Sequence, residues 1–187
     1  MVEKINFDGI IEELSRRERE NDAVISHARP IIREIATAIK LVHEGRLEEA
    51  GRMAESCMGK AAKLPKTRHN EYLFDPILQE LAELYIVLAI AGKKPLPTHE
   101  SLGMPIQPYL TGLCDAVGEV RRKMLESLKA GNVEEAKYLF DSMSSIYEST
   151  IPIRFSSSLL PSFKRKQDVA RAQVEQARSE LLRHIRP

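Results

Sequence analysis

Residues 31–42 read IIREIATAIKLV, and apolar side chains recur in this stretch at every third or fourth position. This period is that of one face of an α-helix that packs against a core. The same spacing extends back to Ile10, so we expect one long helix over residues 5–43, kinked at Pro30 and stopped by Gly45. No stretch of the chain alternates apolar and polar residues as a half-buried strand would. The pattern therefore predicts an all-α fold.

Glycines and prolines divide the rest of the chain into further helical segments. Asn132 and Glu135 have the spacing of a capping box at the start of one of them. Six long helices and one short one predict a seven-helix bundle that forms a single domain over residues 1–187. Besides the first helix, we expect long helices at about 46–64, 68–91, 109–131, 132–149 and 162–185, and a short one beginning at Thr98.

The composition of the 187 residues is that of an ordinary globular protein, with 43% apolar and 29% charged residues. The formal net charge of +1 excludes a strongly basic nucleic-acid coat and a strongly acidic tail. Two cysteines, Cys57 and Cys114, are too few for a disulfide framework and indicate a reducing compartment. The first residues are charged where a signal peptide is apolar, and no apolar stretch is long enough to cross a bilayer. We therefore expect a cytoplasmic protein with no membrane partner.

Two of the expected helices each carry an acidic pair on a surface that is otherwise apolar. Glu83 follows Glu80 by one turn and interrupts an apolar block, and Asp115 and Glu119 are the only charged residues of 108–120. Their spacings place the two members of each pair on one helix face. A buried carboxylate without a partner is strongly disfavoured, and four together are typical ligands of Mg²⁺ or Mn²⁺. The pattern indicates a site for a divalent cation.

A structural alternative is that each acidic pair lies at a helix edge and is neutralised by Arg121, Arg122 or Lys123. Gly112 and Gly118 flank the second pair and leave room for a neighbouring backbone, a metal or a ligand. If a metal binds, the absence of Glu-x-x-His pairs excludes a ferritin-like di-metal oxidase. An all-α nucleoside triphosphate pyrophosphohydrolase and a metal-dependent phosphodiesterase that acts on nucleic acid both stay open.

Four segments carry a resemblance to a known family: residues 78–83 (LQELAE), 109–122 (YLTGLCDAVGEVRR), 131–134 (GNVE) and 162–168 (SFKRKQD). Together they resemble the translin superfamily, and within it the translin-associated factor X type, over essentially the whole chain. The resemblance implies a translin-like bundle of seven helices that assembles into a closed, hollow homo-oligomer, expected to be an octamer. It leaves open whether a translin-type partner subunit joins the assembly.

The resemblance also implies an activity. In proteins of the translin-associated factor X type, four acidic residues bind Mg²⁺ and cut RNA, and by position these are Glu80, Glu83, Asp115 and Glu119. All four would be both catalytic residues and metal ligands of an Mg²⁺-dependent endoribonuclease, with Mn²⁺ as an alternative ion. The first alternative is a non-catalytic protein of translin type that binds single-stranded RNA or DNA. The second is the pyrophosphohydrolase.

Basic residues are candidates for binding the RNA backbone, although a solvated helix face is the plainer interpretation of such runs. Aromatic residues make up only 5% of the chain and tryptophan is absent, so base stacking can contribute little. We therefore expect weakly sequence-selective binding of single-stranded or short duplex RNA, and also of single-stranded DNA. The candidate residues are Lys60, Lys63, Lys66, Arg68, His69, Arg122, Lys164, Arg165 and Lys166.

Overall fold

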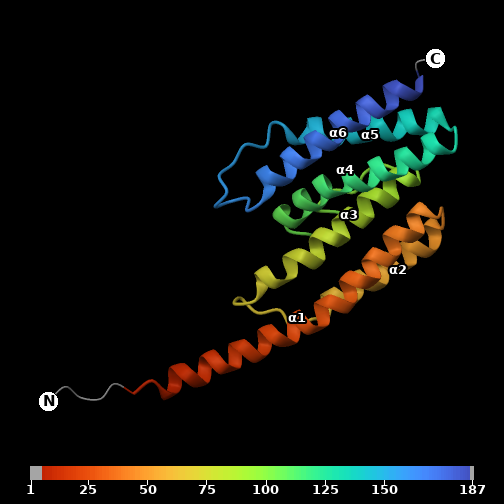
Figure 1. Ribbon diagram of the computed structural model, residues 1–187. Helices are drawn as coiled ribbons and strands as arrows, with labels where there is room; N and C mark the ends of the chain where they lie inside the picture. Colours follow the sequence, from red (N-terminus) through yellow and green to blue (C-terminus); the bar gives the residue numbers. More distant parts are fainter. Residues whose placement is uncertain (1–5, 186–187) are drawn as a thin grey trace.

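The structure, a computed structural model, describes residues 6–185 and contains six α-helices and one short 3₁₀ helix in that range, with no β-strand (Figure 1). The predicted all-α fold is confirmed. In chain order the elements are α1 (Asp8–His43), α2 (Leu47–Ala62), η1 (Glu71–Phe74), α3 (Asp75–Ala91), α4 (Ile106–Lys129), α5 (Val133–Thr150) and α6 (Phe163–Ile185). Helix α4 contacts α3, α5 and α6, while α1 packs on α2 and α3.

Helix α1 has 36 residues, and only its C-terminal part belongs to the core. Its buried residues begin at Val24, whereas Ile10 and Leu14 are exposed, and its first turns extend away from the other helices (Figure 1). Pro30 lies inside the helix. Gly45 follows the helix end with φ of +78°, a left-handed conformation that glycine adopts without steric cost. The predicted long first helix and its stop are therefore confirmed.

Helices α3 and α4 are in close contact at Gly112. A Cβ atom added there would lie 2.3 Å from the carbonyl oxygen of Gln79 and 2.8 Å from the Cβ atom of Ala82. The backbone of α3 therefore fills the space that a side chain would need. At Gly118, six residues further along α4, an added Cβ atom would meet nothing within 4 Å. Gly112 thus leaves room for the backbone of α3, whereas Gly118 borders open space.

The third long helix begins later than predicted. Helix α3 starts at Asp75 and has Pro76 in its first turn, where the missing N–H group leaves no helical hydrogen bond unmade. The preceding residues form η1, so the short helix lies at 71–74 and its predicted position at Thr98 was wrong. Thr98 and Ser101 instead form a turn, in which each backbone N–H group donates to the hydroxyl of the other residue.

The start of α5 has the predicted N-cap. The side chain of Asn132 accepts a hydrogen bond from the N–H group of Glu135 at 3.1 Å. The Glu135 carboxylate does not return this bond, because it pairs with Lys93 at 2.9 Å, and the N–H group of Asn132 donates to the carbonyl of Ser127. The predicted capping box is thus half formed. Helix α4, which precedes this turn, begins at Ile106, a little earlier than predicted.

The core of the bundle includes both cysteines, which carry free thiols. Burial raises the pKa of Cys57 to about 11 and that of Cys114 to about 12, so both thiols are neutral near pH 7. They act as small packing residues. In the part of the chain that the structure describes, no helix combines the length and the apolar character that a membrane span requires.

Candidate active site

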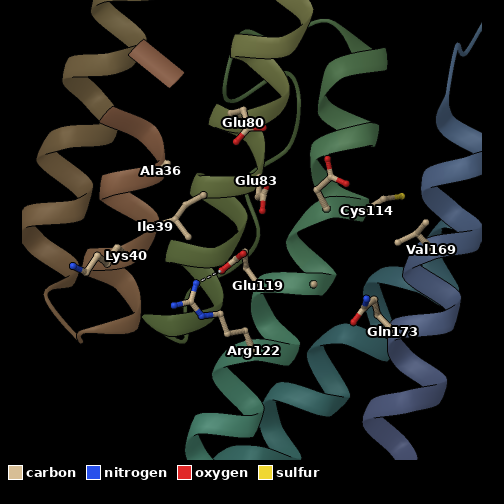
Figure 2. Close-up of a pocket in the computed structure, with 12 residues that line it drawn as sticks. Ala36, Ile39, Lys40, Glu80, Glu83, Cys114, Glu119, Arg122, Val169 and Gln173 are labelled. Atoms are coloured by element: carbon tan, nitrogen blue, oxygen red, sulfur yellow. Dashed lines mark ion pairs between the residues drawn. The ribbon is translucent and has the colours of Figure 1, made fainter. Parts of the chain in front are cut away.

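The four predicted acidic residues line one cleft with a volume of about 600 Å³. Glu80 and Glu83 come from α3, and Asp115 and Glu119 come from α4. Figure 2 shows the carboxylates of Glu80, Glu83 and Glu119 pointing into the space between these helices and α1. The other lining residues, from α1, α4 and α6, are Ala36, Ile39, Lys40, Cys114, Gly118, Arg122, Val169 and Gln173.

Helical periodicity and the contact between α3 and α4 explain why the carboxylates meet. The i,i+3 spacing on α3 and the i,i+4 spacing on α4 place each pair on one face of its helix. The close approach at Gly112 sets the backbone of Gln79 and Glu83 against α4, one turn before Asp115. The acidic pair on α3 and the acidic pair on α4 therefore lie close together, where the two helices pack against each other. Sequence-distant carboxylates thereby share one cleft.

The pair on α3 has no partner of opposite charge. Glu83 is 9% exposed, and within residues 6–185 neither Glu80 nor Glu83 makes a side-chain hydrogen bond or an ion pair. Burial, followed by repulsion from the neighbouring carboxylates, raises the pKa of Glu83 to about 8. Burial and the nearby Asp115 also raise the pKa of Glu80. These two carboxyl groups are the ones that a cation would stabilise most.

Asp115 is held by residues from two other helices. The ammonium group of Lys166, on α6, donates to both of its carboxylate oxygens, at 2.7 Å from Oδ1 and 2.6 Å from Oδ2. The side-chain amide of Gln79, on α3, donates to Oδ2 at 2.9 Å. Both side chains of the ion pair are about four-fifths buried. Lys166, which the sequence analysis assigned to an RNA-binding surface, therefore lies against the acidic cluster.

Glu119 is held by His43, the last residue of α1. The ring atom Nε2 lies 2.6 Å from Oε2 of Glu119, and because a carboxylate only accepts, Nε2 carries the proton. The His43 side chain is 5% exposed, and its Nδ1 atom is buried without a hydrogen bond, 3.4 Å from a carboxylate oxygen of Glu126. The hydrogen bond from His43, more than the nearby charge of Arg122, lowers the pKa of Glu119.

His43 was missed by the sequence analysis. The signal that could have found it is its spacing, because it follows Ile39 by four residues and so continues the apolar face of α1. A histidine in such a position is buried and must find a polar partner. The identity of that partner, 76 residues away in sequence, is not visible without the fold.

The donor chemistry of the cleft fits a hard divalent cation, because carboxylate oxygens are the ligands that Mg²⁺ and Mn²⁺ prefer. Glu83 in particular is buried, aimed into the cleft and unpaired. In residues 6–185, however, no three Asp, Glu, His or Cys side chains are grouped closely enough to hold an ion. Metal binding therefore requires the carboxylates to converge.

The basic residues that follow the acidic pair on α4 point in different directions. Arg121 pairs with Glu180 on α6, and Lys123 reaches the carbonyl of Val42 at 3.5 Å. Only Arg122 approaches the acidic pair, at 3.7 Å from Glu119. The neutralisation of the pairs by three consecutive basic residues, the structural alternative of the sequence analysis, is thus limited to Arg122.

The remaining RNA-binding candidates lie outside the cleft. Lys60 pairs with Glu34 across α1 and α2. Lys66 lies 3.7 Å from Glu71 and stacks over the ring of Phe74 at 6.0 Å from its centroid. The exposed candidates lie in two segments, residues 60–69 and the start of α6, and are Lys60, Lys63, Lys66, Arg68, His69, Lys164 and Arg165. Two basic surfaces therefore exist, and their role in RNA binding stays a prediction.

Comparison with known proteins places this fold. No protein-family model matches the chain. The chain is similar to an uncharacterized protein of Methanocaldococcus jannaschii, with 24% identity over 98% of this chain and 84% of the relative. It is similar to the crystal structure of AfC3PO, with 26% identity, a TM-score of 0.84 and coverage of 96% of this chain and 97% of that chain. The chain is a member of the translin superfamily. The predicted superfamily is confirmed.

Two further structures show the fold of this translin-superfamily protein. One is a complex of AfC3PO with duplex RNA, with 24% identity, a TM-score of 0.82 and coverage of 96% of both chains. The other is apo-NeC3PO, with 21% identity, a TM-score of 0.81 and coverage of 98% of this chain and all of that chain. The shared fold thus spans nearly the whole chain.

Proposed function

We propose that this translin-superfamily protein is a metal-dependent endoribonuclease of the translin-associated factor X type. The observation that carries the proposal is the shared cleft of four carboxylates, of which Glu83 is buried and unpaired. A buried carboxylate with a pKa near 8 is unfavourable unless a cation compensates its charge. Mg²⁺ is the proposed ion, with Mn²⁺ as an alternative.

The residues of the cleft have separate tasks in this proposal. Glu80, Glu83, Asp115 and Glu119 hold the ion, which when bound polarises a phosphate oxygen and activates a water for attack on the phosphodiester. Arg122 lines the same cleft with its side chain 57% exposed, and its guanidinium group suits a phosphate oxygen of the substrate. No histidine or lysine is needed as a general base in this scheme.

RNA is the proposed substrate, single-stranded or in a short duplex. The support is the shared fold with AfC3PO, a protein whose structure holds duplex RNA, together with the two exposed basic surfaces. We further propose that the chain acts inside a closed homo-oligomer, an octamer, with a translin-type subunit as a candidate partner. Exposed apolar residues on the projecting part of α1, among them Ile10, Ile11 and Leu14, support such assembly.

A second candidate is a non-catalytic nucleic-acid-binding protein of translin type. The observation that favours it is the ion pair of Lys166 with Asp115, which already neutralises one of the four carboxylates. In such a protein the cluster would be structural, and the basic surfaces would bind RNA or single-stranded DNA. The two candidates differ in whether a divalent cation changes the fate of bound RNA.

The test is cleavage of a labelled RNA by the wild-type protein and by Asp115→Asn and Glu119→Gln, in Mg²⁺ and in EDTA. Single-stranded RNA, its duplex and DNA of equal sequence are compared. We expect Mg²⁺-dependent cleavage that both substitutions abolish, with RNA affinity changed little, because binding depends on basic residues. Asp141→Asn, an exposed position on α5, is the matched control. Wild-type cleavage rates in either cleft variant would refute the site, and binding without any cleavage would favour the second candidate.

A further inference from the structure

Lys166 is held beside the cleft by Asp115, one of the four carboxylates proposed to bind the metal ion. Its ammonium group lies within 2.7 Å of both oxygens of Asp115, and the Gln79 amide donates to one of the same oxygens. A metal ligand must offer at least one lone pair that points at the ion. Lys166 and Gln79 together occupy about three of the four lone-pair sites of the Asp115 carboxylate, and the Lys166 charge repels an incoming cation.

The position of Lys166 differs from that of its basic neighbours on α6. Lys164 is exposed and pairs along its own helix with Asp168 at 2.7 Å, and Arg165 is exposed. The Lys166 side chain is 22% exposed and turns toward the acidic cluster instead. Its charge partly offsets the rise in pKa that burial causes at Glu80 and Glu83. Lys166 therefore acts electrostatically on three of the four carboxylates.

We propose that Lys166 is an internal cation that competes with the divalent metal for Asp115 and, once displaced, binds a phosphate oxygen of the RNA. The inference rests on the proposed function, and it adds a substrate-binding residue from α6 to the carboxylates of α3 and α4. A lysine suits both positions because its ammonium is a compact charge on a flexible four-carbon stem. When the ion occupies the cleft, the negative charge that attracts Lys166 is neutralised, and the incoming phosphate offers a new partner in the same space.

The proposal predicts two effects of opposite direction. In Lys166→Met the competitor is gone, so the affinity for Mn²⁺ in the absence of RNA rises on the order of three- to tenfold. In the same variant the phosphate contact is gone, so the KM for RNA at saturating Mn²⁺ rises several-fold. If Lys166 were only part of an RNA-binding surface, its removal would weaken RNA binding and leave the affinity for Mn²⁺ unaltered.

The experiment measures Mn²⁺ binding by electron paramagnetic resonance and RNA cleavage kinetics for wild type, Lys166→Met and Lys164→Met. The last is the matched control for Mn²⁺ binding, because it removes the same charge from an exposed position two residues away. If Lys166→Met has a lower Tm than wild type, Lys166→Gln repeats the test with a neutral but polar side chain. Tighter Mn²⁺ binding with a raised KM supports the proposal.

The possible failures can be told apart. Equal or weaker Mn²⁺ binding in both Lys166 variants, with normal binding in wild type, overturns the role of Lys166 and leaves the nuclease proposal intact. A wild-type protein that binds no Mn²⁺ overturns the proposed function and the inference together. Tighter Mn²⁺ binding in the Lys164→Met control to the same extent would show that the effect is one of general charge, and would also overturn the role of Lys166.

Discussion

The contact between α3 and α4 at Gly112 predicts that Gly112→Ala destabilises the protein, and the distances in the structure give the size of the effect. Gly112→Ala places a Cβ atom 2.3 Å from the carbonyl oxygen of Gln79, 2.8 Å from the Cβ atom of Ala82 and 3.0 Å from the backbone N of Glu83. Two of these three atoms belong to the backbone of α3 and cannot turn away. The helices must therefore move apart by roughly 1 Å, since ordinary carbon contacts lie at about 3.5–4.0 Å.

The magnitude follows from two opposing effects. Alanine is favoured over glycine inside a helix by about 1 kcal/mol. Overpacking a tight contact costs about 1–3 kcal/mol, and a clash with backbone belongs to the upper end of that range. We expect Gly112→Ala to lower the free energy of unfolding by about 2 kcal/mol. For a chain of 187 residues this corresponds to a Tm lower by about 4–8 °C.

The assay is urea unfolding monitored by circular dichroism, with Gly118→Ala as the matched control. An added Cβ atom at Gly118 meets nothing within 4 Å, so only the helix propensity changes, and we expect that variant to gain up to about 1 kcal/mol. Equal shifts in the two variants, or a Gly112→Ala variant as stable as wild type, would refute the inferred backbone contact. Because the same contact sets Glu83 beside Asp115, Gly112→Ala should also weaken Mn²⁺ binding.

Two further predictions concern the electrostatics of the cleft. The pKa of Glu83 is raised from 4.5 to about 8 in the folded protein, so the stability associated with its neutral form is fully present below about pH 4.5 and is lost as the pH rises toward 8. In urea unfolding with EDTA, Glu83→Gln should therefore have the same free energy of unfolding as wild type near pH 4.5. Near pH 8.5 it should be more stable than wild type by about 1 kcal/mol or more. Parallel pH profiles of the two proteins would contradict this prediction. His43→Ala should weaken Mn²⁺ binding by about tenfold, because Glu119 loses the partner that orients it, and His43→Gln should restore part of the affinity. Titration calorimetry measures both. Unchanged Mn²⁺ affinity in both variants would exclude a positioning role for His43.

The helices could be predicted from the sequence because their signals are local. The apolar period of residues 31–42, the stop at Gly45 and the N-cap at Asn132 each depend on neighbours within a few positions, and all three are present in the structure. The start of α3 at Asp75 was misplaced because Pro76 is acceptable both within the first turn of a helix and in the loop before it. Local sequence does not decide between these two positions.

The acidic cluster was also accessible from the sequence, because charged residues stand out in apolar helices. Its partners were not. His43 and Lys166 reach the cleft from α1 and α6, and lie 76 and 51 residues from the carboxylates that they hold. In the sequence Lys166 belongs to a basic run that suggests one surface, but successive residues of a helix point in different directions, so Lys166 reaches Asp115 on α4 while Arg165 is exposed.

The acidic pairs on α3 and α4 differ in how freely they can bind a cation, because among the residues that the structure describes only the α4 pair already has hydrogen-bond partners. On α3, Glu80 and Glu83 are unpaired and their pKa values are raised, so a divalent ion would gain most of its electrostatic stabilisation there. On α4, Asp115 and Glu119 are ordered by Lys166 and His43. The difference between the two partners matters. His43 donates one hydrogen bond and leaves about three of the four lone-pair sites of Glu119 for an ion, whereas Lys166 and Gln79 together leave about one at Asp115. The ion should therefore meet the α3 pair and Glu119 first, and the capture of Asp115 should be the step that depends on Lys166.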